Sequence, residues 1–211
     1  MPRTYQSSRI NLKVNLPDTI IYFSRHGETD WNVSERIQGQ ENIDINARGR
    51  AQADRNGDLM KSLIGDGEGF DFVASPLRRT RETMERIRTR MGIDPHDYRT
   101  DPRLMEVSFG DWQGFMIEDI AAKTPELVTA RARDKWNFVP PGKTAESYAI
   151  LGKRVASWLS EVKGPTVCVT HGGCLRTIFQ MIEGLDGHDA ANLAITQDHI
   201  LRLENGKLTW M

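Results

Sequence analysis

Three short segments of the sequence place histidine or arginine side chains directly after an apolar run. The segments are RHG at 25–27 after TIIYFS at 19–24, PLRR at 76–79 after FDFVAS at 70–75, and HGG at 171–173 after TVCVT at 166–170. A guanidinium group matches two phosphate oxygens at once, and glycine lets backbone N–H groups approach a bound anion closely. If the apolar runs are neighbouring strands, their ends converge, and the residues predict an anion pocket that contains two imidazoles.

The two histidines of this pocket predict a covalent route for phosphoryl chemistry. A neutral histidine beside a phosphate can attack phosphorus and carry the group covalently, and neighbouring cations keep it unprotonated because they disfavour the imidazolium form. A carboxylic acid must then protonate the leaving oxygen, and Glu106, within LMEVSFGDWQG at 104–114, is the candidate. A helix that starts after Gly173 would direct its first N–H groups at the same anion.

Strands and helices that alternate along the chain must position these groups. The three apolar runs predict strands buried on both faces, as in a mostly parallel sheet. Helical spacing of apolar residues predicts helices over 46–63, 76–91, 144–162 and 173–183, with Ser75 as the N-cap of the second and Gly92 at its end. Late strands are expected over 192–196 and 200–210, the latter with a turn at Asn205-Gly206. This alternation predicts an α/β sandwich.

Composition excludes several classes of protein. The chain has 211 residues, and 28 Lys and Arg against 29 Asp and Glu give a formal net charge of −1, so bulk charge predicts neither nucleic acid nor an anionic membrane as partner. No apolar stretch is long enough to span a membrane, and the N-terminus lacks the apolar core of a signal peptide. We expect a cytoplasmic protein with one domain over 1–211, of which 1–17 form an extended lead-in. Cys168 and Cys174 are expected to be buried packing residues.

Four blocks in this order resemble the histidine phosphatase (phosphoglycerate mutase-like) superfamily. The blocks are RHGETDWN at 25–32, SPLRRTRET at 75–83, LMEVSFGDWQG at 104–114 and VTHGG at 169–173. The resemblance implies a three-layer α/β/α sandwich whose central sheet is mostly parallel and carries helices on both faces. It also implies a two-step reaction through a phosphohistidine, without a metal or other cofactor.

The resemblance further implies a role for each matching residue. His26 would be the nucleophile and Glu106 the proton donor. Arg79, rather than Arg78, matches the arginine of its block. The residues that would bind the phosphoryl group are Arg25, Asn32, Arg79, His171 and Gly172.

Several functional classes remain open. Within the family we favour a phosphomonoesterase that acts on a small phosphorylated metabolite, because the segment 115–139 is short where the resemblance implies a longer basic insertion in dedicated mutases. The alternatives are phosphoglycerate mutase-type transfer and a non-catalytic module that binds a phospholigand. A metal hydrolase with ligands His26, Glu28, Asp30, Glu106 and His171 fits no common metal motif, and the arginines would repel a cation. The sequence leaves open whether the chain forms a homodimer.

Overall fold

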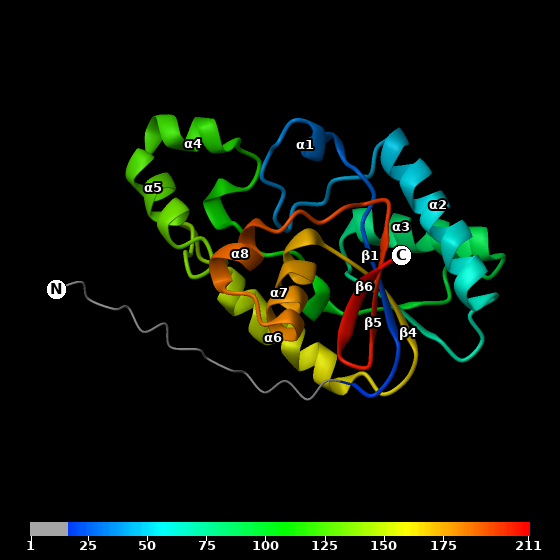
Figure 1. Ribbon diagram of the computed structural model, residues 1–211. Coiled ribbons are helices and arrows are strands. Elements are labelled where there is room, and N and C mark those ends of the chain that lie inside the picture. Colours follow the sequence, from blue (N-terminus) through cyan, green and yellow to red (C-terminus); the bar gives the residue numbers. More distant parts are fainter. Residues whose placement is uncertain (1–16) are drawn as a thin grey trace.

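A six-stranded sheet forms the centre of residues 17–211, the part of the chain that this computed structural model describes (Figure 1). The strands are β1 (Ile21–Arg25), β2 (Asp71–Ala74), β3 (Arg99–Thr100), β4 (Thr166–Thr170), β5 (Ile200–Glu204) and β6 (Lys207–Trp210). Their order is β3-β2-β4-β1-β5-β6. The first four are mutually parallel, whereas β5 pairs antiparallel with β1, and β6 pairs antiparallel with β5. The predicted mostly parallel sheet is therefore confirmed, and the three apolar runs are neighbours in it.

Helices cover both faces of this sheet. They are α1 (Asp30–Val33), α2 (Ala47–Ile64), α3 (Arg78–Met91), α4 (Ile117–Lys123), α5 (Pro125–Arg133), α6 (Tyr148–Glu161), α7 (Gly172–Glu183) and α8 (Gly187–Asn192), with short 3₁₀ helices η1 (Pro102–Leu104) and η2 (Gly110–Trp112). Helices α2 and α3 lie on one side of the sheet, and α6, α7 and α8 lie on the other (Figure 1). The three-layer α/β/α sandwich is confirmed.

The apolar residues of β1 alternate between two cores. Tyr22 packs with Met60 and Met84 in the core under α2 and α3. Phe23 belongs to the other core, where its ring meets that of Trp158 edge-on at 6.2 Å between centroids. Because both faces of the strand are buried, consecutive residues must be apolar, which explains the unbroken run in the sequence.

Two glycines inside α2 permit close contacts. An ideal Cβ at Gly57 would lie 2.6 Å from the Cβ of Arg90 on α3, and one at Gly49 would lie 2.2 Å from the carbonyl oxygen of Glu28. Ion pairs flank the same helix interface at Arg50–Glu82, Arg86–Asp54 and Arg90–Asp58. Glycine weakens the helical pattern locally, but here it allows α3 and the backbone of Glu28 to approach α2.

Three expectations about local structure are wrong or shifted. Residues 192–196 are not a strand: α8 ends at Asn192, and the following carbonyl groups bind arginine side chains instead of a neighbouring strand. Ser75 is not the N-cap of α3. The N-cap is Leu77, whose side chain makes no hydrogen bond to the first turn of the helix. The helix expected from 144 begins at Tyr148, where Ser147 caps it. Of the expected lead-in at 1–17, residues 1–16 lie outside the described part.

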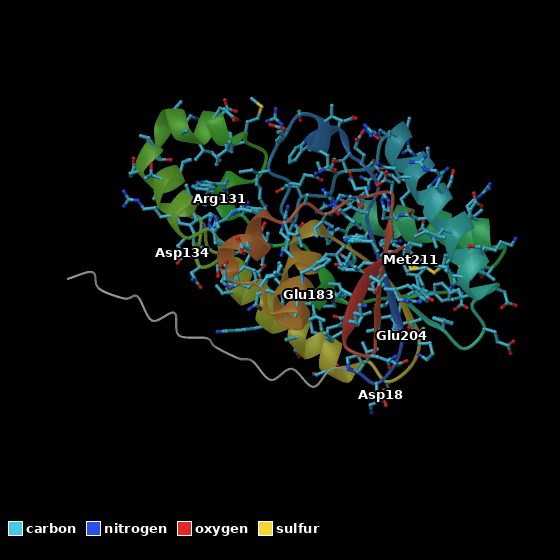
Figure 2. All side chains as sticks on the ribbon, viewed as in Figure 1. Asp18, Arg131, Asp134, Glu183, Glu204 and Met211 are labelled. Atoms are coloured by element: carbon cyan, nitrogen blue, oxygen red, sulfur yellow. The ribbon has the colours of Figure 1, made fainter. Side chains whose placement is uncertain are left out.

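The segment 115–139 carries two helices of its own. Helices α4 and α5 lie together to one side of the sheet (Figure 1), and Arg131 extends from α5 toward the rest of the fold (Figure 2).

Within residues 17–211, no helix is both long enough and apolar enough to cross a membrane.

The buried face of α6 gives a matched test of the core. Leu151 is fully buried, whereas the adjacent Ile150 is 41% exposed. We expect Leu151→Ala to lower the free energy of unfolding by about 2–5 kcal/mol, because it leaves a cavity between α6 and the sheet. Ile150→Ala should change it by less than about 1 kcal/mol. Urea denaturation measures both, and equal losses would contradict this placement of α6.

Candidate active site

Two histidines meet at the carboxyl ends of neighbouring strands. His26 follows β1 and His171 follows β4, and the backbone N–H of His26 donates to the carbonyl of Thr170 at 3.0 Å. The ring centroids lie 5.2 Å apart, and the two side chains are 2% and 0% exposed. The convergence expected for parallel strand ends therefore holds for both imidazoles.

Hydrogen bonding selects one tautomer of His26. Its Nδ1 lies 2.8 Å from the carbonyl oxygen of Gly27, which can only accept, so Nδ1 carries the proton and donates. Burial, followed by the charges of Arg79 and Arg25, lowers the pKa of His26 well below its usual value. The ring is consequently neutral near pH 7, and its Nε2 lone pair is available as a nucleophile.

Ser75 orients the second histidine. The Ser75 hydroxyl oxygen accepts the N–H of Leu77 at 3.4 Å and lies 2.8 Å from Nε2 of His171. The other ring nitrogen of His171, Nδ1, has no hydrogen-bond partner among the described residues. Burial, then the charges of Arg79 and His26, lowers the pKa of His171. The sequence offered Ser75 only as a helix cap.

Arg79 is fully buried and held by a loop. Its two terminal nitrogens donate to the carbonyls of Gly39 and Glu41, each at 2.7 Å, while Nε has no partner among the described residues. Gln113 anchors that loop by accepting the N–H of Gln40 at 2.8 Å. The adjacent Arg78, in contrast, points outward and pairs with Asp44 at 2.9 Å.

Arg25, the last residue of β1, adds a second, partly buried guanidinium. Its Nη1 donates to the carbonyl of Ile195 at 2.6 Å, and its Nε lacks a partner within residues 17–211. Burial lowers the pKa of both Arg25 and Arg79 to about 10, and the charge of Glu106 partly offsets this effect. Both groups therefore remain cations at neutral pH.

Glu106 lies against the start of α7. Its two carboxylate oxygens accept the backbone N–H groups of Val107 at 2.9 Å and Gly173 at 3.1 Å. An ideal Cβ at Gly173 would lie 2.0 Å from Oε1 of Glu106, so any side chain at this position would displace the Glu106 carboxylate. Arg154 on α6, which the sequence did not single out, donates to the carbonyl of Glu106 at 2.8 Å and pairs with Glu146.

The remaining predicted phosphate ligands lie nearby in different settings. Asn32 belongs to the capping box of α1, and its side-chain oxygen accepts from the Thr29 N–H and from Gln197 Nε2, both at 3.1 Å. A phosphate contact by Asn32 would therefore have to come from its amide nitrogen. Gly172 begins α7, and an ideal Cβ there would lie 3.5 Å from Nε of Arg25.

The side chains of the metal-site alternative do not assemble. Glu28 accepts a bond from Asn46 and pairs with Arg48, and Asp30 is exposed on α1. In the described part of the chain, no three or more His, Cys, Asp or Glu side chains are grouped so as to hold a metal ion.

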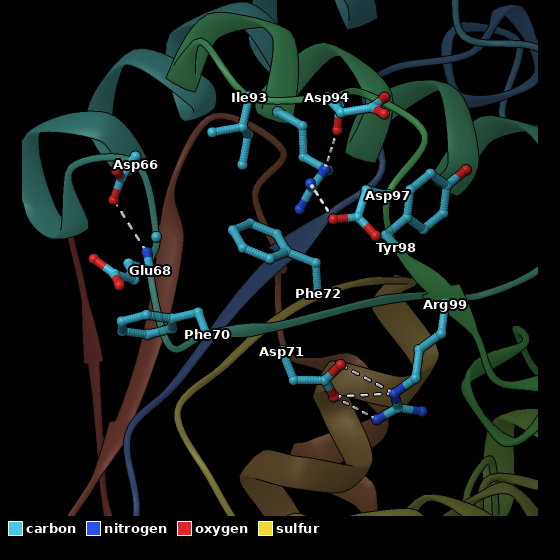
Figure 3. Close-up of a pocket in the computed structure, with 12 residues that line it drawn as sticks. Asp66, Glu68, Phe70, Asp71, Phe72, Ile93, Asp94, Asp97, Tyr98 and Arg99 are labelled. Carbon is cyan, nitrogen blue, oxygen red and sulfur yellow. Dashed lines mark hydrogen bonds and ion pairs between the residues drawn. The ribbon is translucent and has the colours of Figure 1, made fainter.

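A separate surface pocket lies near the opposite end of β2. Asp71, the first residue of β2, lines it and binds Arg99, and Arg88 pairs there with Asp97 (Figure 3). The histidines lie at the other end of the strands, so this pocket is not part of the candidate active site.

The fold and site together define an enzyme that handles phosphoryl groups. Residues 21–210 match the model of the histidine phosphatase superfamily (branch 1), and the chain belongs to that family. Its relatives include phosphatases and phosphoglycerate mutases, and the chain is an enzyme of this class.

Individual relatives show how similar the chain is to them. It is 33% identical to glucosyl-3-phosphoglycerate phosphatase of Mycobacterium tuberculosis, over 73% of this chain and 70% of that protein. It is 29% identical to the 2,3-bisphosphoglycerate-dependent phosphoglycerate mutase of Afipia carboxidovorans, over 81% of this chain and 84% of that protein. The solved structure of mycobacterial glucosyl-3-phosphoglycerate phosphatase with VO3 superposes with a TM-score of 0.71 at 27% identity, over 91% of this chain and 96% of that one.

The neutral buried histidines predict a loss of stability in mild acid. Since the folded pKa of His171 is lowered, the unfolded chain binds a proton below about pH 6.5 that the folded chain does not, and the free energy of unfolding falls as pH falls. His171→Asn should reduce this slope between pH 6.5 and 5 by up to about 1.4 kcal/mol per pH unit. Urea denaturation at several pH values measures the slope. The control is His188→Asn, at an exposed position of α8; an unchanged slope in His171→Asn would contradict the prediction.

Proposed function

We propose that the protein is a metal-independent phosphomonoesterase that acts through a phosphohistidine at His26. One observation carries the proposal: Nε of Arg25, Nε of Arg79 and Nδ1 of His171 are buried without partners among the described residues. The ring of His171 lies 5.2 Å from that of His26, and the charges of both arginines act on the pKa of His26. Buried donors without acceptors cost free energy. The oxygens of a phosphoryl group would accept from all three, which supports a phosphate ester as the ligand.

The first chemical step forms a covalent intermediate. Nε2 of His26 attacks phosphorus, the bond from phosphorus to the leaving oxygen breaks, and a protonated Glu106 gives its proton to that oxygen. Arg25 and Arg79 stabilise the charge on the phosphoryl oxygens, and the Nδ1–H of His171 donates to one of them. Because these groups are held in place before substrate binds, little reorganisation is needed during the step.

The second step releases inorganic phosphate. Water attacks phosphorus, the Glu106 carboxylate takes a proton from that water, and the bond from phosphorus to Nε2 breaks. His26 returns to its neutral form. The short segment between Glu106 and α6, and the resemblance to a relative named as a phosphatase, favour transfer to water over return to a second substrate.

Removal of the nucleophile should stop the reaction. His26→Ala is expected to lower kcat for p-nitrophenyl phosphate in excess EDTA at least about 1,000-fold, because no phosphohistidine can form. Phosphate release measures the rate, and acid-labile label trapped from ³²P-substrate reports the intermediate. His188→Ala on α8 is the control and should retain activity. Near-native turnover by His26→Ala would rule out the assignment of His26 as the nucleophile.

Conversion of 3-phosphoglycerate to its 2-isomer with a bisphosphate primer, and without phosphate release, would indicate a mutase.

The acid role of Glu106 depends on the leaving group. Glu106→Gln should slow hydrolysis of an alkyl phosphate about 100-fold or more, because the alkoxide needs a proton, and slow an activated aryl phosphate far less. Values of kcat for the two substrates measure the difference. Equal losses on both would argue against proton donation by Glu106.

A further inference from the structure

Side-chain donors from other elements hold the carbonyl groups of the segment that carries Glu106. Residues 105–109 form neither a helix nor a strand, and η1 ends just before them at Leu104. The carbonyl of Leu104 accepts from the Thr170 hydroxyl at 2.9 Å, and the carbonyl of Glu106 accepts from Nε2 of Gln40 at 2.9 Å. The position of Glu106 therefore depends on side chains that reach its segment from elsewhere in the fold.

Arg154 of α6 holds three further carbonyl contacts of this segment. Its Nη1 donates to the carbonyls of Arg103 at 2.7 Å and Met105 at 2.6 Å, and its Nη2 donates to the carbonyl of Glu106 at 2.8 Å. Its Nε and Nη2 also donate to the two carboxylate oxygens of Glu146, at 2.9 and 2.8 Å. A guanidinium group has five N–H donors, and these five contacts match that number.

Glu146 balances the charge of Arg154 and binds the same segment. Its carboxylate accepts the N–H of Ser108 at 3.1 Å, and its own N–H donates to the Ser108 carbonyl at 2.8 Å. The two side chains of the ion pair are only 19% and 17% exposed. An unbalanced cation here would favour the ionised form of Glu106, whereas the acid must carry a proton in the first step. The pair thus holds the segment on both sides of Glu106 without a net charge.

Arg154 differs in this respect from the arginines of the phosphoryl site. Nε of Arg25 and Nε of Arg79 have no partner within residues 17–211, and neither group is bonded to a carboxylate there. Every nitrogen of Arg154, in contrast, donates to another part of the protein. Its contacts indicate that Arg154 acts on the protein backbone.

The backbone of Glu106 has to be held because proton transfer depends on distance. The carboxyl group must lie within hydrogen-bond distance of the leaving oxygen, and a displacement of about 1 Å can slow an enzyme about 100-fold. The carboxylate itself accepts only two backbone N–H groups among the described residues, those of Val107 and Gly173. A shift of the segment would therefore move the carboxyl group with it.

We infer that Arg154, neutralised by Glu146, is a positioning residue that holds Glu106 where it protonates the leaving oxygen. This inference rests on the proposed function, since it assumes that Glu106 is the acid. Arg154 acts through the carbonyl groups of residues 103–106. Its loss should therefore impair proton donation and spare the steps that need no acid.

Arg154→Lys tests the inference. Lysine keeps the positive charge, but its three donors on one nitrogen cannot hold Glu146 and the carbonyl groups together. The alkyl substrate is glycerol 3-phosphate or 3-phosphoglycerate, whichever the wild-type protein hydrolyses faster. We expect its kcat/KM to fall about 10-fold or more, and that of p-nitrophenyl phosphate to stay within about 3-fold, because the aryl leaving group needs no proton. Equal losses on both substrates would overturn the inference.

Arg86→Lys is the matched control. Arg86 of α3 also binds a carboxylate through Nε and Nη2, that of Asp54 at 3.0 and 2.6 Å, but it lies at the interface with α2. We expect the ratio of the two kcat/KM values to change by less than about 2-fold. A change as large as that of Arg154→Lys would show that the loss of any such ion pair is sufficient, and would contradict the inference.

A double-variant cycle shows whether Arg154 acts through Glu106. In the Glu106→Gln background no acid remains to be positioned, so Arg154→Lys should lower kcat/KM for the alkyl substrate by less than about 3-fold. A further loss as large as in the wild-type background would mean that Arg154 acts by another route, and the inference would be wrong.

Glu146→Gln gives a second test at a different residue and serves if Arg154→Lys does not fold. Glutamine has one acceptor oxygen where glutamate has two, so it cannot bind both Nε and Nη2 of Arg154, and it leaves the charge of Arg154 unbalanced. The same selective loss on the alkyl substrate is expected. Urea denaturation shows which variants are folded. Equal losses on both substrates in folded Glu146→Gln would again overturn the inference.

The outcomes separate this inference from the proposed function. If Glu106→Gln slows the alkyl substrate selectively but Arg154→Lys slows both substrates alike, the role of Arg154 alone is wrong. If Glu106→Gln slows both alike, the acid role of Glu106 is wrong, and the role of Arg154 with it. Absence of hydrolysis of every phosphomonoester would overturn the proposed function itself.

Discussion

Buried positive charge is the constraint around which this molecule is arranged. Arg79 is fully buried and Arg25 is partly buried, yet their protein partners are carbonyl groups of Ile195, Gly39 and Glu41, which do not neutralise them. A carboxylate in direct contact would stabilise each arginine but would occupy the place of a phosphate. The protein instead supplies neutral acceptors, and within residues 17–211 the Nε of each arginine has no partner.

Irregular segments, rather than strands, supply the neutral carbonyl acceptors for these arginines. A strand directs its carbonyl groups to its neighbour, whereas residues 193–197 leave the sheet and direct theirs at side chains. Leu193 accepts from Arg176, Ile195 from Arg25, and Gln197 from Asn56. The loop at 39–41 does the same for Arg79. These segments therefore connect the arginines to the rest of the fold, and the side chain of Ile195 also packs in the apolar core.

The same charges determine the state of the two histidines. Burial and the neighbouring guanidinium groups lower the pKa of His26 and His171, and the carbonyl of Gly27 fixes the tautomer of His26. His26 thereby presents the lone pair of its Nε2, whereas Nε2 of His171 lies against the Ser75 hydroxyl. Two residues of the same type consequently have different surroundings because of one contact each, with Gly27 and with Ser75.

The sequence by itself determined the strands and the chemistry at their ends. The apolar runs before His26 and His171 are unbroken because both faces of the sheet are covered, and adjacent parallel strands bring such ends together. What the tertiary structure alone decided is which polar groups meet over long sequence separations. The carbonyl of Ile195, the hydroxyl of Ser75 and the side chain of Arg154 act through contacts between distant segments that leave no periodic pattern. The packing of Trp136, in the segment after α5, on Tyr148 of α6 and Gly187 of α8 leaves none either. Residue type and spacing predict local structure, whereas pairing between distant segments depends on packing that only the folded chain defines.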